Sequence, residues 1–454
     1  MLNSIKIAFR NTLRNKRRTL LSVLAIAIGG FASLLIGSFV SSVNQGIQTG
    51  VARSSGHLHI HKKGYFDFGA GSVGEYDIED YDAIIQKIKE SSLGSYINVI
   101  TPTLSIGGIA GNYAKNSSQT FVGIGLVADE QKKMQSWDGY GIDMPSEQSA
   151  LENYHDGGLI GMGLAINLNL CQELKIKGCK EKKEKVNNAP IDEDIADFTI
   201  DEPIKEEGVM ISLLAASSKG APNIVRLPIE KVWKQTNKEM DDRFVAMPLH
   251  IAQQLVYGSD TKKVNTINVQ LKSPDDIDKV AQDMEQFFAQ NGLDLEVIKL
   301  SDFNPQIQKV IGMFSVIFAF VSMIIGLIAI FTVSNTMTMS IMERFNEIGT
   351  LRSMGLRRSG VRTYFLLEGS IIGIFGATLG VALAIIVTSI INSIGLMWTP
   401  PNVSQPTQLV FNLTDNIPLI VGVWIFLVII SIISSILPAI RASKMPIVDA
   451  LRHN

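Results

Sequence analysis

Four stretches of this 454-residue chain contain no Asp, Glu, Lys or Arg, and their length limits what the chain can fold into. They cover residues 19–42, 310–342, 369–414 and 416–440. A helix needs about 20 apolar residues to cross the hydrocarbon core of a bilayer, and every stretch is long enough. Paired prolines in "GLMWTPPNVSQP" end the third helix near residue 397. The pattern predicts four transmembrane helices rather than four buried helices of a soluble protein.

The chain begins with a basic segment. Residues 1–18 carry six Lys and Arg and no acid, and an apolar run follows. A signal peptide is the alternative interpretation, but its apolar region is typically about 7–15 residues long and ends at an A-x-A site, which is absent here. The segment predicts an amphipathic basic helix followed by an uncleaved first membrane helix.

Lys and Arg are unevenly distributed between the predicted loops. Residues 343–362 carry five Arg against two Glu, and the last 14 residues add three basic residues against one acid. Since positively charged loops stay in the cytoplasm, both termini and this loop are expected there, in a multi-pass protein of the cell inner membrane. The predicted segments are a cytoplasmic basic helix (1–18), a first span (19–42), an extracytoplasmic α+β domain of two lobes (43–306), a second span with a stalk (307–342), a cytoplasmic coupling segment (343–360), a third span (361–397), a short outer loop (398–415), a fourth span (416–440) and a cytoplasmic tail (441–454).

The large segment between the first two spans has the composition of a soluble domain. Residues 42–306 carry 26 Lys and Arg against 38 Asp and Glu, a net charge of −12, which argues against nucleic-acid binding. "HLHIHKK", "VNTINVQL" and "LEVIKL" alternate as strands do, whereas "YDAIIQKIKESS" and "DDIDKVAQDMEQFFAQNG" have helical spacing. These segments predict an α+β domain assembled from both ends of the insert, with a variable loop at 175–210.

Two groups in this domain invite a chemical interpretation. His57, His59 and His61 alternate on one predicted strand, but no Cys or acidic cluster completes a metal site, so packing histidines are favoured. Cys171 and Cys179 are the only cysteines, and an oxidising compartment permits a disulfide between them.

Residues 341–360, "IMERFNEIGTLRSMGLRRSG", place charge between two apolar runs. Helix formers dominate up to residue 354, and Gly355 offers a stop. Phe345, Ile348, Leu351 and Met354 recur at helical spacing, so one face can lie on the membrane or on a partner. A loop that only anchored the chain would not need paired acids and two glycines.

This segment resembles the signature of the FtsX-like permease family, the macrolide-exporter and lipoprotein-releasing ("type VII") class of ABC transporter. Three further segments are similar to the family in the same order: "AFRNTLRNKRRTLLSVLAIAIG", "LLEGSIIGIFGATLGVALA" and "LPAIRASKMPIVDALR". "GLIGMGLAINLNL" and "VAMPLHIAQQLV" also resemble family patterns inside the outer domain.

The resemblance implies a permease subunit that does no catalysis itself. The dipeptide Gly-Lys never occurs, so the phosphate-binding G-x-x-x-x-G-K-[ST] loop is absent, and a separate ABC ATPase would bind ATP and Mg. The family usually works as two permease chains, identical or paralogous, with two ATPases. Membrane lipid and a periplasmic adaptor, chaperone or lipoprotein are further expected partners. By position, the implied ATPase-coupling residues are Glu343, Arg344, Glu347, Gly349, Arg352 and Gly355.

Small residues recur every four positions in two spans, a pattern that lets helices approach closely within one chain or at a dimer seam. They are Ala25, Gly29, Ser33 and Gly37 in the first span and Gly369, Gly373, Gly376 and Gly380 in the third. Glu368 is the one acid close to the third span, and a pair with Arg362 or Arg352 is expected.

Three functions remain in view. The favoured one couples ATP hydrolysis to extracytoplasmic movement (mechanotransmission), in release of lipoproteins from the inner membrane or export of another amphipathic substrate. The alternative is an ATP-driven regulator of a cell-wall hydrolase, although such division-type relatives have a much smaller outer domain. An enzyme in the outer domain is disfavoured, because no Ser-His-Asp, paired-acid or metal pattern has useful spacing.

Overall fold

The structure, a computed structural model, describes residues 10, 16–69, 74–141, 157–176, 209–235, 238–258, 261–299, 302, 305–398 and 407–446. It divides into two compact units. The helical unit comprises Met1–Gly46, Gln306–Met397 and Gln408–Asn454, and the α+β unit comprises Ile47–Pro305 and Trp398–Thr407. Nearly all of the predicted helix at 1–18, most of the variable loop and the end of the cytoplasmic tail lie outside the described residues.

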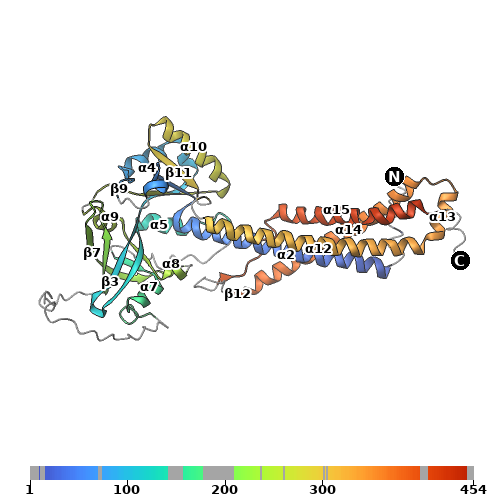
Figure 1. The fold of residues 1–454 in the computed structure, drawn as a ribbon, viewed down its shortest axis with the longest axis horizontal. Coiled ribbons are helices and arrows are strands. Elements are labelled where there is room, and N and C mark those ends of the chain that lie inside the picture. Colours follow the sequence, from blue (N-terminus) through green and yellow to red (C-terminus); the bar gives the residue numbers. More distant parts are fainter. Residues whose placement is uncertain are drawn as a thin grey trace. The chain divides into compact units, whose positions relative to one another are not determined.

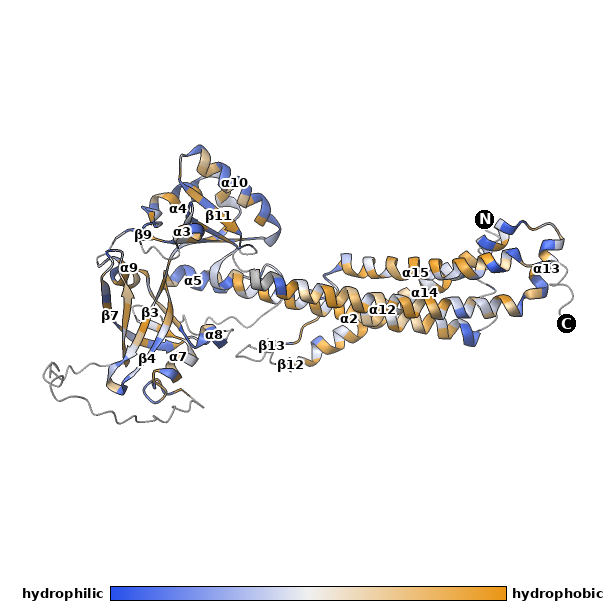
Figure 2. Ribbon diagram, viewed as in Figure 1, coloured by the Kyte–Doolittle hydropathy of each residue, from blue (hydrophilic) through white to orange (hydrophobic). Residues whose placement is uncertain are grey.

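Four long helices dominate the helical unit, and their middle parts are strongly apolar (Figure 2). They are α2 (Lys16–Ser55), α12 (Pro305–Glu343), α14 (Arg358–Ile394) and α15 (Ile417–Lys444). All four are long and apolar enough to cross a membrane, which confirms the predicted class of fold. An apolar segment in lipid forms a helix because only a helix satisfies every backbone N–H and C=O within the segment. The short α13 (Phe345–Ser353) joins α12 to α14 (Figure 1).

Two of these helices are much longer than a bilayer core is thick. Helix α2 has 40 residues and α12 has 39. At a rise of 1.5 Å per residue each measures about 60 Å, twice the ~30 Å of hydrocarbon. Both extend beyond the predicted spans 19–42 and 307–342.

The first half of the α+β unit is an antiparallel sheet of order β11-β1-β10-β3. Its elements come from both ends of the insert, as the alternating segments predicted. They are β1 (Leu58–Lys62), α4 (Tyr81–Glu90), β3 (Ile97–Asn112), β10 (Thr266–Leu271), α10 (Ile277–Gln290) and β11 (Leu295–Lys299).

The second half is a closed ring of six strands, and the sequence patterns did not predict its closure. Strand β3 continues into it and pairs with both β4 and β6, and the ring closes in the order β3-β4-β8-β5-β7-β6. The added strands are β4 (Ser117–Leu126), β5 (Gly158–Ile160), β6 (Val209–Ala216), β7 (Pro222–Val232) and β8 (Phe244–Pro248). In the closed ring every strand has a paired neighbour on both sides.

Short elements complete the described residues. They are α3 (Tyr65–Phe68), β2 (Ile78–Glu79), η2 (Ser92–Ser95), η3 (Tyr113–Lys115), α5 (Ala128–Gln135), α7 (Met162–Asn167), α8 (Lys238–Asp241), α9 (Leu249–Tyr257), β9 (Lys263–Val264), η5 (Pro274–Asp276), β12 (Met397–Trp398) and β13 (Thr407–Gln408).

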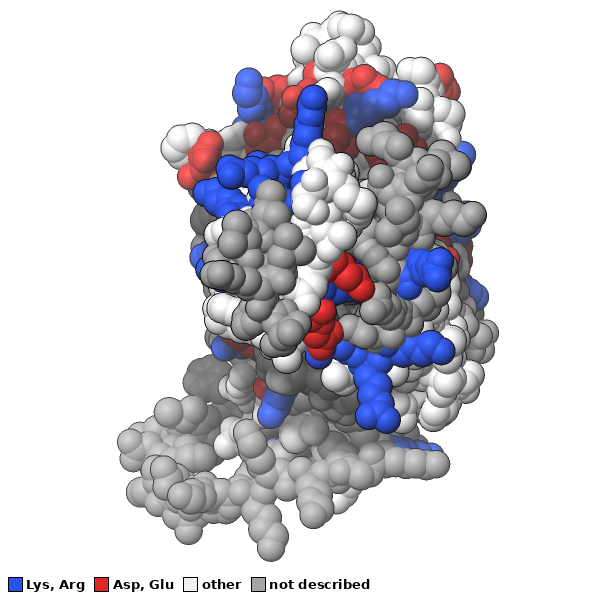
Figure 3. Space-filling view, turned by 90° about the vertical axis from the view of Figure 1, so that its right-hand side faces the viewer, with Lys and Arg blue, Asp and Glu red and all other residues white. Residues whose placement is uncertain are grey.

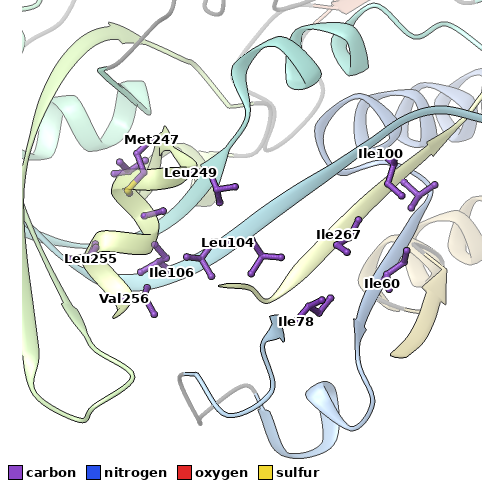
Figure 4. Packing of buried hydrophobic residues seen from close by; sticks show 14 of the residues in the cluster. Ile60, Ile78, Ile100, Leu104, Ile106, Met247, Leu249, Leu255, Val256 and Ile267 are labelled. Atoms are coloured by element: carbon purple, nitrogen blue, oxygen red, sulfur yellow. The ribbon is translucent and has the colours of Figure 1, made fainter. Parts of the chain in front are cut away.

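One hydrophobic core runs through both halves of the α+β unit. Strand β3 supplies Ile100 on the side of the first sheet and Ile106 on the side of the ring, with Leu104 between them (Figure 4). Ile60 of β1 and Met247 of β8 belong to the same cluster. Because the long strand and its side chains are shared, the two halves form a single unit.

Candidate functional site

The predicted coupling segment forms a separate short helix at one end of the four-helix bundle (Figure 1). Helix α12 ends at Glu343 and α13 begins at Phe345. Between them Arg344 has φ −108° and ψ 22°, outside the helical region. The chain therefore changes direction at Arg344, without a proline or glycine.

Gly355 ends α13 for a conformational reason. Its φ is +97°, a value that residues with a Cβ rarely adopt. The Gly355 N–H donates to Arg352 O at 3.1 Å, and the Leu356 N–H donates to Leu351 O at 3.0 Å. This pair of bonds is a Schellman motif, which confirms that the glycine is a helix stop.

One face of α13 is buried against the helical unit and the other is open. Ile348 packs into a cluster with Ile341, Val361, Phe365, Ala439 and Ala442, and Gly349 is buried beside it. Glu347 and Thr350 are exposed, as are Leu351 at 46% and Met354 at 71%. The apolar positions that share helical spacing are thus divided between the core and the open face.

Arg344 and Glu343 take part in ion pairs inside the chain. Arg344 is 6% exposed, and its Nη1 lies 3.5 Å from Oε2 of Glu368, which is 4% exposed. The expected partner of Glu368 was Arg362 or Arg352, and this prediction is wrong. Because the chain turns at Arg344, the side chain of this residue lies against α14. Arg352 instead donates to the Met445 carbonyl, and Arg362 donates to Ser443 Oγ at 3.0 Å.

Arg18, at the start of α2, forms an ion pair with Glu343 at 2.6 Å. The Arg352–Met445 contact brings the end of α15 to α13. The start of α2, α13 and the end of α15 therefore lie at the same end of the bundle. In the view toward this end, basic and acidic side chains both reach the surface (Figure 3).

The structure divides the six predicted coupling residues into two groups. Glu347 and Gly355 are exposed on or next to the open face. Arg344 and Gly349 are buried, and Glu343 and Arg352 contact α2 and the chain after α15. The sequence patterns did not predict the ion pair of Arg18 with Glu343. The position of Arg18, a basic residue at the predicted membrane boundary, was a signal that an acidic partner could be expected.

The small residues of α2 and α14 face other helices of the same chain. A Cβ at Gly29 would lie 2.7 Å from Ile325 Cγ2, and one at Gly37 would lie 2.9 Å from Leu419 Cδ1. Ser33 is buried and Ala25 is half-buried.

In α14 the four glycines face two neighbours. Built Cβ atoms at Gly369 and Gly373 meet Ser435 and Ser431 of α15, and those at Gly376 and Gly380 meet Ile26 and Ala27 of α2. Both stripes thus serve packing within one chain.

The cysteine prediction is only partly covered by the structure. Cys171 is buried and disulfide-bonded. Cys179 lies outside the described residues, so their pairing stays a prediction.

The three histidines on and before β1 are buried in the α+β unit. Burial lowers the pKa of His57 and of His59 to about 4, and that of His61 to about 3. His57 Nδ1 accepts a hydrogen bond from the Leu271 N–H at 3.0 Å, and the His61 ring stacks on Tyr65 at 4.8 Å. Within the described residues, no group of three His, Cys, Asp or Glu could hold a metal ion.

The fold and the site together define a multi-pass membrane protein that has an α+β unit inserted between its first and second apolar helices. Two known families match its sequence. The FtsX-like permease C-terminal family matches residues 316–447, and the MacB-like periplasmic core domain family matches residues 19–176. Each of the two matches covers less than half of the chain, and the chain is similar to ABC transporter permeases such as LolC and MacB.

Three curated relatives show how far the similarity extends. An uncharacterized ABC transporter permease of Methanocaldococcus jannaschii is 27% identical over 49% of this chain and 53% of the relative. The lipoprotein-releasing system transmembrane protein LolC of Haemophilus influenzae is 31% identical over 29% of this chain and 33% of LolC. The macrolide export ATP-binding/permease protein MacB of Psychrobacter cryohalolentis is 30% identical over 30% of this chain and 18% of MacB. The chain thus spans about half the length of the first relative and less of the other two.

Two solved structures of extracytoplasmic regions are also similar. The extracellular domain of the transporter YknZ matches 49% of this chain and 90% of its own, at 12% identity and a TM-score of 0.27. The periplasmic region of MacB from Actinobacillus actinomycetemcomitans matches 57% of this chain and 95% of its own, at 13% identity and a TM-score of 0.30.

Proposed function

We propose that this permease couples ATP hydrolysis by a separate ABC ATPase to movement of its α+β unit. Helix α13 carries this proposal, because it is a short, partly open helix between two membrane spans. The ATPase binds ATP and Mg, and this chain itself performs no catalysis. The protein lies in the inner membrane of the cell. Arg and Lys are concentrated at the end of the bundle that contains α13, so this end faces the cytoplasm.

The open face of α13 indicates how the ATPase is held. Leu351 and Met354 expose apolar surface, and Glu347 and Arg357 place opposite charges beside it. An apolar centre within a polar rim is typical of protein interfaces. The docking surface is therefore Glu347, Thr350, Leu351 and Met354 rather than the full predicted set, because Arg344 and Gly349 are buried.

The described helices favour an amphipathic cargo that is handled outside the bilayer. Glu368 and Arg344 are buried ionisable residues of the described bundle, and they pair with each other. The glycines of α2 and α14 pack tightly against neighbouring helices, so the described spans are interlocked rather than arranged around a polar path. Lipoproteins are the first candidate cargo, since LolC is a lipoprotein-releasing protein, and other amphipathic substrates follow.

The chain works with a second permease, identical or paralogous, and α12 is the surface that fits it. Of the four described spans α12 is the least buried within its own chain. Its exposed residues include Val316 at 69% and Phe331 at 72%. The glycine stripe of α14 does not form this seam, because it is buried against helices of the same chain.

A copurification test addresses the coupling. The tagged full chain is isolated from its native membranes, and nucleotide hydrolysis is measured in the purified complex. We expect Glu347→Arg and Met354→Asp each to lower the amount of copurified ATPase about tenfold. Loss of one central contact of an interface costs on the order of 1.4 kcal/mol of binding free energy. Lys132→Glu, on the exposed side of α5, is the matched control and leaves it unchanged.

A chain that carries no nucleotide hydrolase from its own membranes would disprove the coupling. The cargo is tested separately in the same complex. ATP-dependent release of a lipoprotein from vesicles supports the first candidate, whereas recovery of cell-wall hydrolases without lipoproteins favours the regulatory alternative.

A further inference from the structure

No proline or glycine lies at the bend between α12 and α13. Kinks of helices usually occur at Pro, at Gly or Ser, or where a side chain enters the backbone hydrogen-bond ladder. Residues 341–347, "IMERFNE", contain none of these, and most are good helix formers. Left to local preference, α12 would continue through Arg344 as one helix, so tertiary contacts must hold the bend.

The contacts at Arg344 can do this. Its guanidinium lies 3.5 Å from Glu368 Oε2 and donates to the hydroxyl of Tyr364, one turn earlier on α14. Ser340 of α12 lines the same small pocket as Arg344 and Glu368. One buried ion pair therefore joins the last turn of α12, the bend and the first half of α14.

The pair is difficult to break. Both side chains are almost completely buried. A single buried charge without its partner is strongly unfavourable where water does not reach it, so the two groups stay together or leave together. Ile348, four residues after the bend, adds an apolar anchor next to Val361 and Phe365 of α14.

We propose that the Arg344–Glu368 pair is a rigid joint that makes α13 move with α14, so that a force applied to α13 is delivered to the third span. Arg344 is a positioning residue rather than a docking residue. The purpose of this joint rests on the proposed coupling function. Whether the pair fixes α13 to α14 can be tested without any ATPase.

The test measures distances within the full chain in lipid nanodiscs by pulsed electron spin resonance. Cys171 and Cys179 are replaced by serine, and spin labels are placed at Thr350 on α13 and Thr363 on α14, both exposed. We expect Arg344→Gln and Glu368→Gln each to broaden the distance distribution at least about twofold or to shift it, since each removes one charge of the buried pair.

Rescue separates a joint from general damage. The exchanged pair, Arg344→Glu with Glu368→Arg, is expected to narrow the distribution again, and Arg344→Lys, which keeps the charge, to give an intermediate width. Arg357→Gln, an exposed arginine of the same segment, is the control and leaves the width unchanged. A second label pair, Thr363 with the exposed Leu437 of α15, reports whether α14 and α15 keep their contact.

Unchanged widths in both single variants, or an exchanged pair no narrower than they are, would overturn the joint. If Arg344→Gln cannot be purified, Arg344→Lys and Glu368→Gln decide the question in the same way. The copurified hydrolase is measured on matched samples without spin labels, in which Thr350 and the rest of the docking surface are unchanged. A joint without any hydrolase would contradict the coupling function alone, and hydrolase binding without a joint would contradict only this inference.

Discussion

Single buried carboxylates hold key turns of this protein in place. Glu368 does so in the helical unit, and Asp241 does so in the α+β unit. Asp241 is 4% exposed, and its Oδ1 accepts hydrogen bonds from the N–H groups of Met162 at 3.1 Å and Gln235 at 2.7 Å. Its Oδ2 accepts a third from the Gly163 N–H at 2.8 Å. The carboxylate therefore joins the start of α7 to the chain after β7.

Asp241→Asn is expected to loosen this turn. The amide has one acceptor oxygen, so its NH₂ would face a backbone N–H that then has no partner. An unsatisfied buried donor costs about 1–3 kcal/mol, and the free energy of unfolding should fall by roughly that amount. Hydrogen exchange of residues 158–170, followed by mass spectrometry, should accelerate. Asp129→Asn, on the exposed first turn of α5, is the control, and equal exchange in both variants would contradict the role of Asp241.

At the scale of elements, the pairing of α14 with α15 depends on the absence of side chains. Ser431 Oγ donates to Gly369 O at 2.8 Å, a contact between a side chain and the backbone of a neighbouring helix. A Cβ at Gly369 would lie 1.9 Å from Ser435 Oγ, closer than atoms can approach. Small residues here let two helices touch backbone to side chain, which stabilises helix pairs in lipid.

Gly369→Ala is expected to push α14 away from α15. Overpacking of this kind costs about 1–3 kcal/mol, so the thermal midpoint of the full chain in nanodiscs should fall. Gly422→Ala in α15 is the matched control, because nothing lies within 4 Å of its built Cβ. That change should be neutral or slightly stabilising, since Ala favours a helix over Gly by up to about 1 kcal/mol. Equal midpoints for the two variants would refute the close contact.

At the scale of the whole molecule, the α+β unit contains buried titratable groups on and near β1 that make its stability depend on pH. His57, His59 and His61 have folded pKa values of about 4, 4 and 3, below the ordinary value of 6.5. The folded state favours the neutral rings, so their contribution is complete above pH 6.5 and declines as the pH falls toward 4. Buried Asp77 acts in the opposite direction, because desolvation raises its pKa.

The α+β unit should therefore unfold in mild acid. At about pH 5 each histidine lowers the free energy of unfolding by roughly 2 kcal/mol, because each pH unit below its unfolded pKa contributes about 1.36 kcal/mol. His61→Phe keeps an aromatic ring against Tyr65 and removes one titration, so the midpoint of acid unfolding should move to lower pH. His250→Gln, at an exposed position, is the control. An unchanged midpoint in His61→Phe, measured by tryptophan fluorescence, would show that the ring's charge does not matter.

The sequence alone determined the features that follow from local composition. The four uncharged runs predicted membrane-length helices, because only a helix satisfies its backbone N–H and C=O groups within one apolar segment in lipid. Alternation predicted β1, β10 and β11, and helical spacing predicted α4 and α10, since each pattern reflects one buried face. Gly355 marked the end of α13, because its backbone conformation favours a residue without a side chain.

Only the tertiary structure decided which distant residues meet. The partner of Glu368 is Arg344 because the chain bends there, and no residue near the bend announces it. The closure of the ring depends on β3 pairing with β6, more than 100 residues later in the chain, at Gly108–Gly111. The glycines of α14 face α2 and α15 rather than another subunit because helix contacts depend on how the whole bundle packs. Spacing shows that a face is available for contact, whereas its neighbour is set by the folded chain.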